Sequence, residues 1–130
     1  MPIESDQEQS IQQQLSKQLE RVMPLYGSVI RRVLSELEGE DRMTIPHFRA
    51  LQAIYHRGDR GALNLELARH LGVAAPSMTA MIDGLVDRGL VDRSIDPEIR
   101  RQVNIVLTGR GEDRYHTISS AISERLAFGL

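Results

Sequence analysis

The sequence predicts a mostly helical α+β fold, a winged helix-turn-helix with an N-terminal and a C-terminal helix that serve dimerisation. Three observations support this fold class. Both ends of the chain have helical spacing of apolar residues, two short helical segments in the middle are joined by a turn at Gly72, and the spacing becomes strand-like after Gly89. These changes divide the chain into an N-terminal helical segment (1–43), a winged core (44–108) and a C-terminal helix (109–130).

Composition restricts the possible function classes. The chain has 130 residues, a formal net charge of −2, 41% hydrophobic residues and no cysteine. This is the profile of one ordinary globular domain, and it excludes disulfides, thiolate metal sites and cysteine nucleophiles. No secretory leader or apolar stretch of membrane-spanning length is visible, so we expect a cytoplasmic protein that does not enter a membrane.

The N-terminal segment predicts an amphipathic helix with one narrow apolar stripe. Ile11, Leu15, Leu19 and Val22 recur at steps of three and four residues among polar side chains. A stripe this narrow suits pairing with another helix. Pro24 removes a backbone donor, so we expect the helix to kink or restart there before continuing to about residue 38.

The central segment predicts three helices in succession. Thr44 is a suitable N-cap for the first, which ends near residue 57. Asn64 is a suitable cap for the second, which runs to about residue 70, and Gly72 can adopt the left-handed conformation that follows it. The third helix has Pro76 in its first turn and ends before Gly89.

The remaining segment predicts a hairpin and a final helix. Residues 90–95 and 102–107 are β-prone runs separated by a polar loop, as in a wing. Thr108 is a suitable cap for a helix that starts at about residue 109. A tight pair of helices alone is also compatible with an ordinary helical hairpin, but the adjoining wing with two arginines at its tip favours DNA binding.

Residues 44–111 resemble the MarR family of bacterial winged helix-turn-helix transcription regulators. The resemblance lies in the motifs ELARHLGV, MTAMIDGLVDRGLV and DPEIRRQVNIVLTGRG. It implies a homodimer that binds double-stranded DNA at a near-palindromic operator, usually as a repressor. It also implies release by a small aromatic or phenolic effector. Similar proteins usually continue with a further helix beyond Leu130, so we expect the helix at residues 5–23 to pair across the dimer axis.

The candidate DNA-binding residues lie on the second helix of the motif and in the wing. Helical spacing turns Met78, Met81 and Ile82 toward the core. On the opposite face, hydroxyl groups can hydrogen-bond to phosphates or base edges, and the small apolar residues can contact thymine methyl groups. The candidates are Ala75, Pro76, Ser77, Thr79 and Ala80 on the helix, Arg93, Arg100 and Arg101 in the wing, and Asn64 in the preceding helix.

Other ligands have weaker support in the sequence. Segments that border the effector pocket of similar proteins contain Tyr26, His47, Arg49 and Tyr115, which a core or interface role explains equally well. We expect no metal, no cofactor and no enzymatic activity, because no ligand spacing, phosphate loop or nucleophile elbow is present. The uncharged helix face leaves one alternative open, a winged-helix module that binds protein instead of specific DNA.

Overall fold

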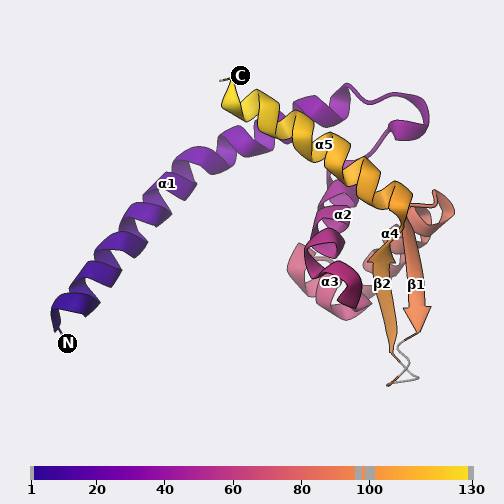
Figure 1. The fold of residues 1–130 in the computed structure, drawn as a ribbon, viewed down its shortest axis with the longest axis horizontal. Coiled ribbons are helices and arrows are strands. Elements are labelled where there is room, and N and C mark those ends of the chain that lie inside the picture. The colour runs from indigo at the N-terminus through magenta and orange to yellow at the C-terminus, as the bar shows by residue number, and fades with distance from the viewer. Residues whose placement is uncertain (1, 96–97, 99–101, 129–130) are drawn as a thin grey trace.

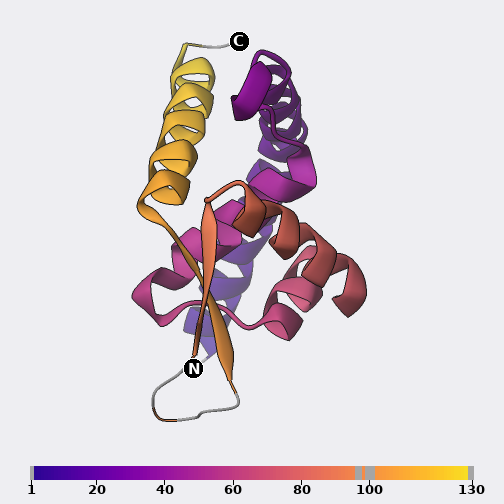
Figure 2. The same cartoon turned by 90° about the vertical axis from the view of Figure 1, so that its right-hand side faces the viewer.

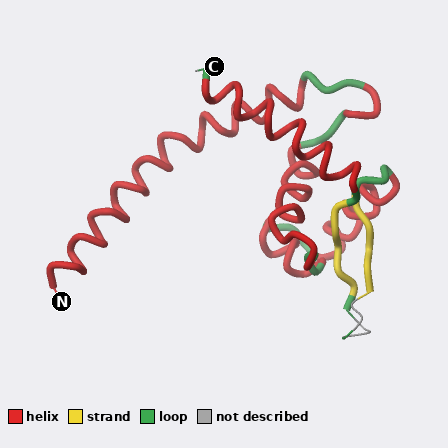
Figure 3. Tube along the Cα trace, in the orientation of Figure 1, coloured by secondary structure: helices red, strands yellow, loops and turns green. Residues whose placement is uncertain are grey.

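A computed structural model describes residues 2–95, 98 and 102–128 of the chain. A long helix α1 (Pro2–Ser35) extends away from a body that is formed by the other elements (Figure 1). The body contains the helices α2 (Ile45–Arg57), α3 (Asn64–Leu71), α4 (Ala75–Asp87) and α5 (Gly109–Ala127), and the strands β1 (Val91–Ile95) and β2 (Val103–Leu107). Two short 3₁₀ helices, η1 (Gly39–Asp41) and η2 (Gly58–Arg60), flank α2. The predicted fold class is confirmed, because most of the described chain is helical and there is one two-stranded sheet (Figure 3).

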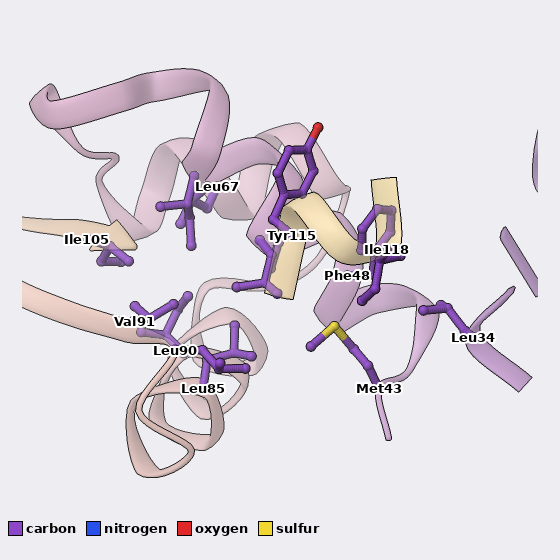
Figure 4. Close-up of a cluster of buried hydrophobic side chains, with 14 of the residues drawn as sticks. Leu34, Met43, Phe48, Leu67, Leu85, Leu90, Val91, Ile105, Tyr115 and Ile118 are labelled. Atoms are coloured by element: carbon purple, nitrogen blue, oxygen red, sulfur yellow. The ribbon is translucent and has the colours of Figure 1, made fainter. Parts of the chain in front are cut away.

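One hydrophobic core joins the body and the C-terminal half of α1. Phe48 of α2, Leu85 of α4 and Ile118 of α5 are among its fully buried side chains (Figure 4). Leu51 of α2 and Ile82 of α4 are also fully buried. Tyr115 of α5 stacks on Phe48 with the ring centroids 6.0 Å apart. Because these side chains come from three helices of the body, the core fixes the position of α4, and therefore of its exposed face.

Helix α1 is continuous through Pro24, so of the predicted kink or restart at this residue the restart is wrong. Proline removes the hydrogen bond to the carbonyl of Glu20. Residues 5–25 are exposed, so water can satisfy that carbonyl in place of the missing donor. Beyond this point Val29, Ile30 and Val33 are buried in the core, and their packing holds the helix together on the C-terminal side of the proline.

The predicted caps are confirmed at two helices and wrong at a third. The hydroxyl groups of Thr44 and Thr108 accept hydrogen bonds from the backbone N–H groups of His47 and Gly111, respectively. Asn64 is instead the first residue of α3. The backbone N–H of Leu63 donates to the Glu66 carboxylate over 3.1 Å, so the glutamate satisfies this helix end.

The hairpin β1–β2 is antiparallel and forms the wing beside α3 and α4 (Figure 2). Its register pairs Val91 with Leu107 and Ile95 with Val103. Ala62, just before α3, bridges to Ile105 of β2 through hydrogen bonds of 2.9 and 2.7 Å. The wing is therefore fixed to the chain that leads into the helix-turn-helix. In the described part of the chain, no helix has the length and apolarity needed to cross a bilayer.

Candidate nucleic-acid interface

Helices α3 and α4 form a helix-turn-helix with the turn at residues 72–74. Gly72 has φ 69° and ψ 34°, the left-handed conformation expected from the sequence. The N–H of Val73 then bonds to the Ala68 carbonyl over 3.0 Å. The side chain of Asn64 donates to the Ala75 carbonyl over 3.3 Å and so ties the start of α3 to the start of α4. Asn64 therefore supports the turn, and contact with DNA remains a proposal for this residue.

The outer face of α4 presents small and uncharged side chains near its start. Pro76, Ser77, Thr79 and Ala80 are exposed, whereas Ala75 is partly buried. Met78, Ile82 and Leu85 are buried on the other side of the helix. The division of α4 into an exposed and a buried face is thus as the helical spacing predicted.

The two hydroxyl groups on this face differ in their hydrogen bonding. Thr79 Oγ1 donates to the Ala75 carbonyl over 3.1 Å, so its proton is engaged within the helix. Its oxygen can still accept a bond. Among the described residues, Ser77 has no hydrogen-bond partner for its side chain, and its hydroxyl can both donate and accept. Ser77 is therefore the more versatile of the two candidates.

Arg93 of β1 forms an ion pair with Asp83 of α4. The partner of Arg93 is thus on another element and is not its sequence neighbour Asp92. In an antiparallel hairpin, neighbouring residues point to opposite faces, so adjacent charges on β1 diverge. Only the tertiary contact between α4 and β1 brings Asp83 and Arg93 together. The ion pair links the candidate DNA-binding helix directly to the wing.

Arg88, at the end of α4, bonds to backbone carbonyls of another segment. Its Nη2 atom donates to the carbonyls of Glu40, over 2.8 Å, and Arg42, over 2.5 Å. The side chain therefore fastens the loop around η1 to the end of α4.

The wing tip carries Arg100 and Arg101, which lie outside the described residues. The strands that lead to the tip end in Ile95 and Val103, and both side chains are exposed, by 66% and 44%. Sequence analysis did not select this apolar pair. Strand alternation predicts this pair, because Ile95 lies on the same face of β1 as Arg93 and Val103 is its partner across the hairpin.

The four residues expected near an effector pocket have separate environments in this chain. Tyr115 is buried between Phe48 and Tyr55, and the Tyr26 hydroxyl accepts a hydrogen bond from Gln52 over 3.1 Å. Arg49 is exposed. Cavities of about 510 and 390 Å³ lie at the α1–α2 connection and between α2 and α3, and none of the four residues lines either of them. Within the described residues, no group of three potential metal ligands has a suitable arrangement.

His47 is partly buried next to the end of α4. Its Nδ1 lies 2.5 Å from the Thr44 hydroxyl, and its Nε2 lies near Gly84. Removal from water, followed in size by the positive charge of Arg88, holds the pKa of His47 below its ordinary value. The folded protein therefore favours the neutral imidazole.

This lowered pKa predicts a stability loss in mild acid. The unfolded chain binds the proton at a higher pH than the folded protein, so the free energy of unfolding decreases as the pH falls below about 6.5. We expect the His47→Gln variant to lose less stability than the parent between about pH 7 and about pH 5. Urea denaturation at both pH values measures this difference, and equal losses in the two proteins would contradict the assignment.

Comparison with known proteins agrees with this geometry. Residues 43–103 match the model of the MarR family. RV1404 from Mycobacterium tuberculosis is 26% identical, with a TM-score of 0.72 over 87% of this chain and 74% of that chain. A mutant of MarR from E. coli, solved in complex with operator DNA, is 25% identical, with a TM-score of 0.66 over 87% of this chain and 76% of that chain.

A third structure shares the fold at lower identity. CouR from Rhodococcus jostii RHA1, solved with bound p-coumaroyl-CoA, is 20% identical, with a TM-score of 0.68 over 89% of this chain and 80% of that chain. The family match covers both helices of the motif and the first residue of β2. Residues 43–103 therefore match a MarR-family domain, and the chain has the winged helix fold of MarR-family structures.

Proposed function

We propose that the protein is a MarR-type DNA-binding transcription regulator. The observation that carries this proposal is the exposed, sterically small face of α4 beside the wing, on a domain that matches the MarR family. In the proposed complex, residues 76–84 enter a major groove, where Ser77 and Thr79 bond to base edges or phosphates and Ala80 contacts apolar groups. Arg100 and Arg101 enter the neighbouring minor groove, whose negative potential attracts arginine. The chromosome that it would bind lies in the cytoplasm.

The regulator would act as a homodimer on a near-palindromic operator, and we propose repression by blocking access to a promoter. Two copies related by a two-fold axis place two recognition helices in major grooves about 34 Å apart. The solved complex of an E. coli MarR mutant with operator DNA supports operator binding by similarity. The segments 1–43 and 109–130 would form the dimer interface on either side of the DNA-binding core at 44–108.

A small aromatic or phenolic effector would release the DNA. The support is the bound p-coumaroyl-CoA of CouR, a protein with a similar fold. We propose Tyr26, His47, Arg49 and Tyr115 as effector contacts in a conformation other than the described one, in which these residues line no common cavity. The effector shifts the protein away from DNA only if it binds a conformation with a different spacing of the two α4 helices more tightly.

Fluorescence anisotropy tests the proposal on DNA from upstream of the protein's own gene and on a scrambled duplex, at two salt concentrations. We expect selective binding that weakens with salt, since cationic contacts to phosphate release counterions. An Arg101→Ala variant should bind less tightly, whereas Arg21→Ala, on the exposed part of α1, should bind like the parent protein. Weak binding that is equal on both duplexes and unaffected by Arg101→Ala would instead favour a protein-binding module.

The ion pair between Asp83 and Arg93 is expected to lower the affinity for DNA, because it occupies the Arg93 guanidinium. In Asp83→Asn, Arg93 loses its carboxylate partner and becomes available for a phosphate, so we expect affinity to increase about threefold to tenfold. The slope of log affinity against log salt should steepen by about 0.9 for one added phosphate contact. Anisotropy titrations at several salt concentrations measure both quantities.

A double variant separates the two causes of this gain. Asp83→Asn also removes a negative charge from the face of α4, which alone favours DNA. In Asp83→Asn with Arg93→Gln, only that general effect remains, so the salt slope should return to that of Arg93→Gln. If the single and double variants gained equally, the released arginine would not be contacting phosphate.

A further inference from the structure

A pocket of about 350 Å³ lies at the C-terminal end of α4, away from the candidate DNA-binding residues at its start. The connection around η1, the end of α4 and the first turns of α5 enclose it. Charged side chains dominate its lining, which consists of Glu40, Asp87, Arg88, Leu90, Arg110 and Arg114. Three guanidinium groups around one small pocket need an explanation, because like charges repel at short range.

The carboxylates present neutralise these guanidinium groups only in part. Arg114 Nη2 contacts Asp41 over 2.8 Å, but its Nη1 is buried without a hydrogen-bond partner. Arg88 donates to backbone carbonyls, which carry no full charge. Arg110 is exposed and forms neither a hydrogen bond nor an ion pair with any described residue. One of the three cations thus has a carboxylate partner.

Arg110 lines the pocket without a charge partner among the described residues. A Cβ atom added to Gly89 would lie 3.4 Å from Arg110 Nη1, so the guanidinium lies against the backbone that links α4 to β1. Its donors therefore remain available at the pocket. A guanidinium presents its N–H groups in a planar fork, which matches the two oxygen atoms of a carboxylate or neighbouring oxygens of a phosphate.

The acidic side chains of the lining distinguish between these two anions. Glu40 and Asp87 form no ion pair with the three arginines among the described residues, so their charges also act on a bound ligand. Together with Asp41, which pairs with Arg114, the two acids balance the three arginines, so the pocket and this ion pair carry no net charge. A monoanion bound by the arginines therefore meets less repulsion from the acids than a phosphate dianion.

We propose that this pocket binds the carboxylate of a small organic monoanion. Arg110 supplies the free fork, and Arg114 lines the same pocket with an Nη1 that has no hydrogen-bond partner. Arg88 keeps the η1 connection closed over the pocket through the carbonyls of Glu40 and Arg42. The site lies at the opposite end of α4 from Ser77 and Thr79, and its occupancy can be measured in the absence of DNA.

Titration of the ¹⁵N-labelled full chain with sodium acetate at constant ionic strength tests the site. We expect saturable shifts of the Arg110 side-chain Nε–H and of the Gly89 amide, half complete below about 50 mM acetate. Arg110→Gln should weaken acetate binding about tenfold, since a charge-assisted fork is lost. Arg21→Gln, which removes an exposed arginine of α1, should leave the acetate titration unchanged.

Two further measurements make the proposal specific. Arg110→Lys keeps the charge but not the fork, so acetate binding should fall between the parent and Arg110→Gln. Inorganic phosphate, titrated at a pH where it is mainly a dianion, should bind more weakly than acetate. Shifts that do not saturate, an equal response in Arg110→Gln and the parent, or tighter binding of phosphate would each overturn the proposal.

Discussion

Replacement of Gly111 by alanine is expected to destabilise the protein by about 3 to 5 kcal/mol. Gly111 lies in the first turn of α5, where it is buried against the short connection between α4 and β1. A Cβ atom at this position would lie 2.0 Å from the Leu90 carbonyl oxygen and 3.0 Å from its carbon. These are backbone atoms, so no side-chain rotation relieves the overlap.

Relief of this overlap would break other contacts. The Leu90 carbonyl accepts the N–H of Thr108 over 3.1 Å, and the Thr108 hydroxyl in turn caps α5. The Leu90 side chain is 1% exposed, so a shift of its backbone also disturbs the core. Urea denaturation measures the loss, and far-UV circular dichroism at low temperature shows whether the variant still folds.

Gly109→Ala is the matched control for this prediction. It changes the same residue type in the same turn of α5, but an added Cβ would have nothing within 4 Å. Its stability should stay unchanged or increase by up to about 0.5 kcal/mol, because alanine loses less backbone entropy than glycine in a helix. A similar loss in both variants would mean that this turn requires glycine for a reason other than the contact with Leu90.

Local signals in the sequence predicted much of this fold. Thr44 and Thr108 precede helices and cap them, and Gly72 has the left-handed conformation that a tight turn needs. These features involve residues within a few positions of one another, so neighbouring residues determine them. The exposed face of α4 was predictable for the same reason, because the periodicity of Met78, Ile82 and Leu85 defines its buried side.

Features that depend on distant contacts could not be predicted. Pro24 predicted a kink or a restart of the helix, but packing of the following residues against the body keeps α1 continuous. Arg93 pairs with Asp83, ten residues away, because β1 packs beside α4. Likewise, Arg110 and Arg114 share a pocket with Arg88 only after α5 has folded against the end of α4. The spacing of residues along the sequence does not predict these tertiary contacts between distant elements.

The exposed stripe of α1 predicts the largest effect on assembly. Ile11, Leu15 and Leu19 are 63%, 58% and 51% exposed, on a part of α1 that extends beyond the body (Figure 1). If the proposed dimer buries this stripe, replacing Leu15 and Leu19 by glutamate removes two apolar contacts per chain and buries charge. We expect dimerisation to weaken by at least about 100-fold, and operator binding with it.

Light scattering at micromolar concentration should then show a monomer for Leu15→Glu with Leu19→Glu. The control, Ser10→Glu with Gln13→Glu, adds the same charge on the opposite face of the helix and should remain dimeric. Because the described structure leaves Leu15 and Leu19 exposed within one chain, far-UV circular dichroism of the body should stay native in both variants. A dimer that persists in the leucine variant would place the interface elsewhere, and the segment 109–130 would then be the element to test, beginning with the exposed Phe128.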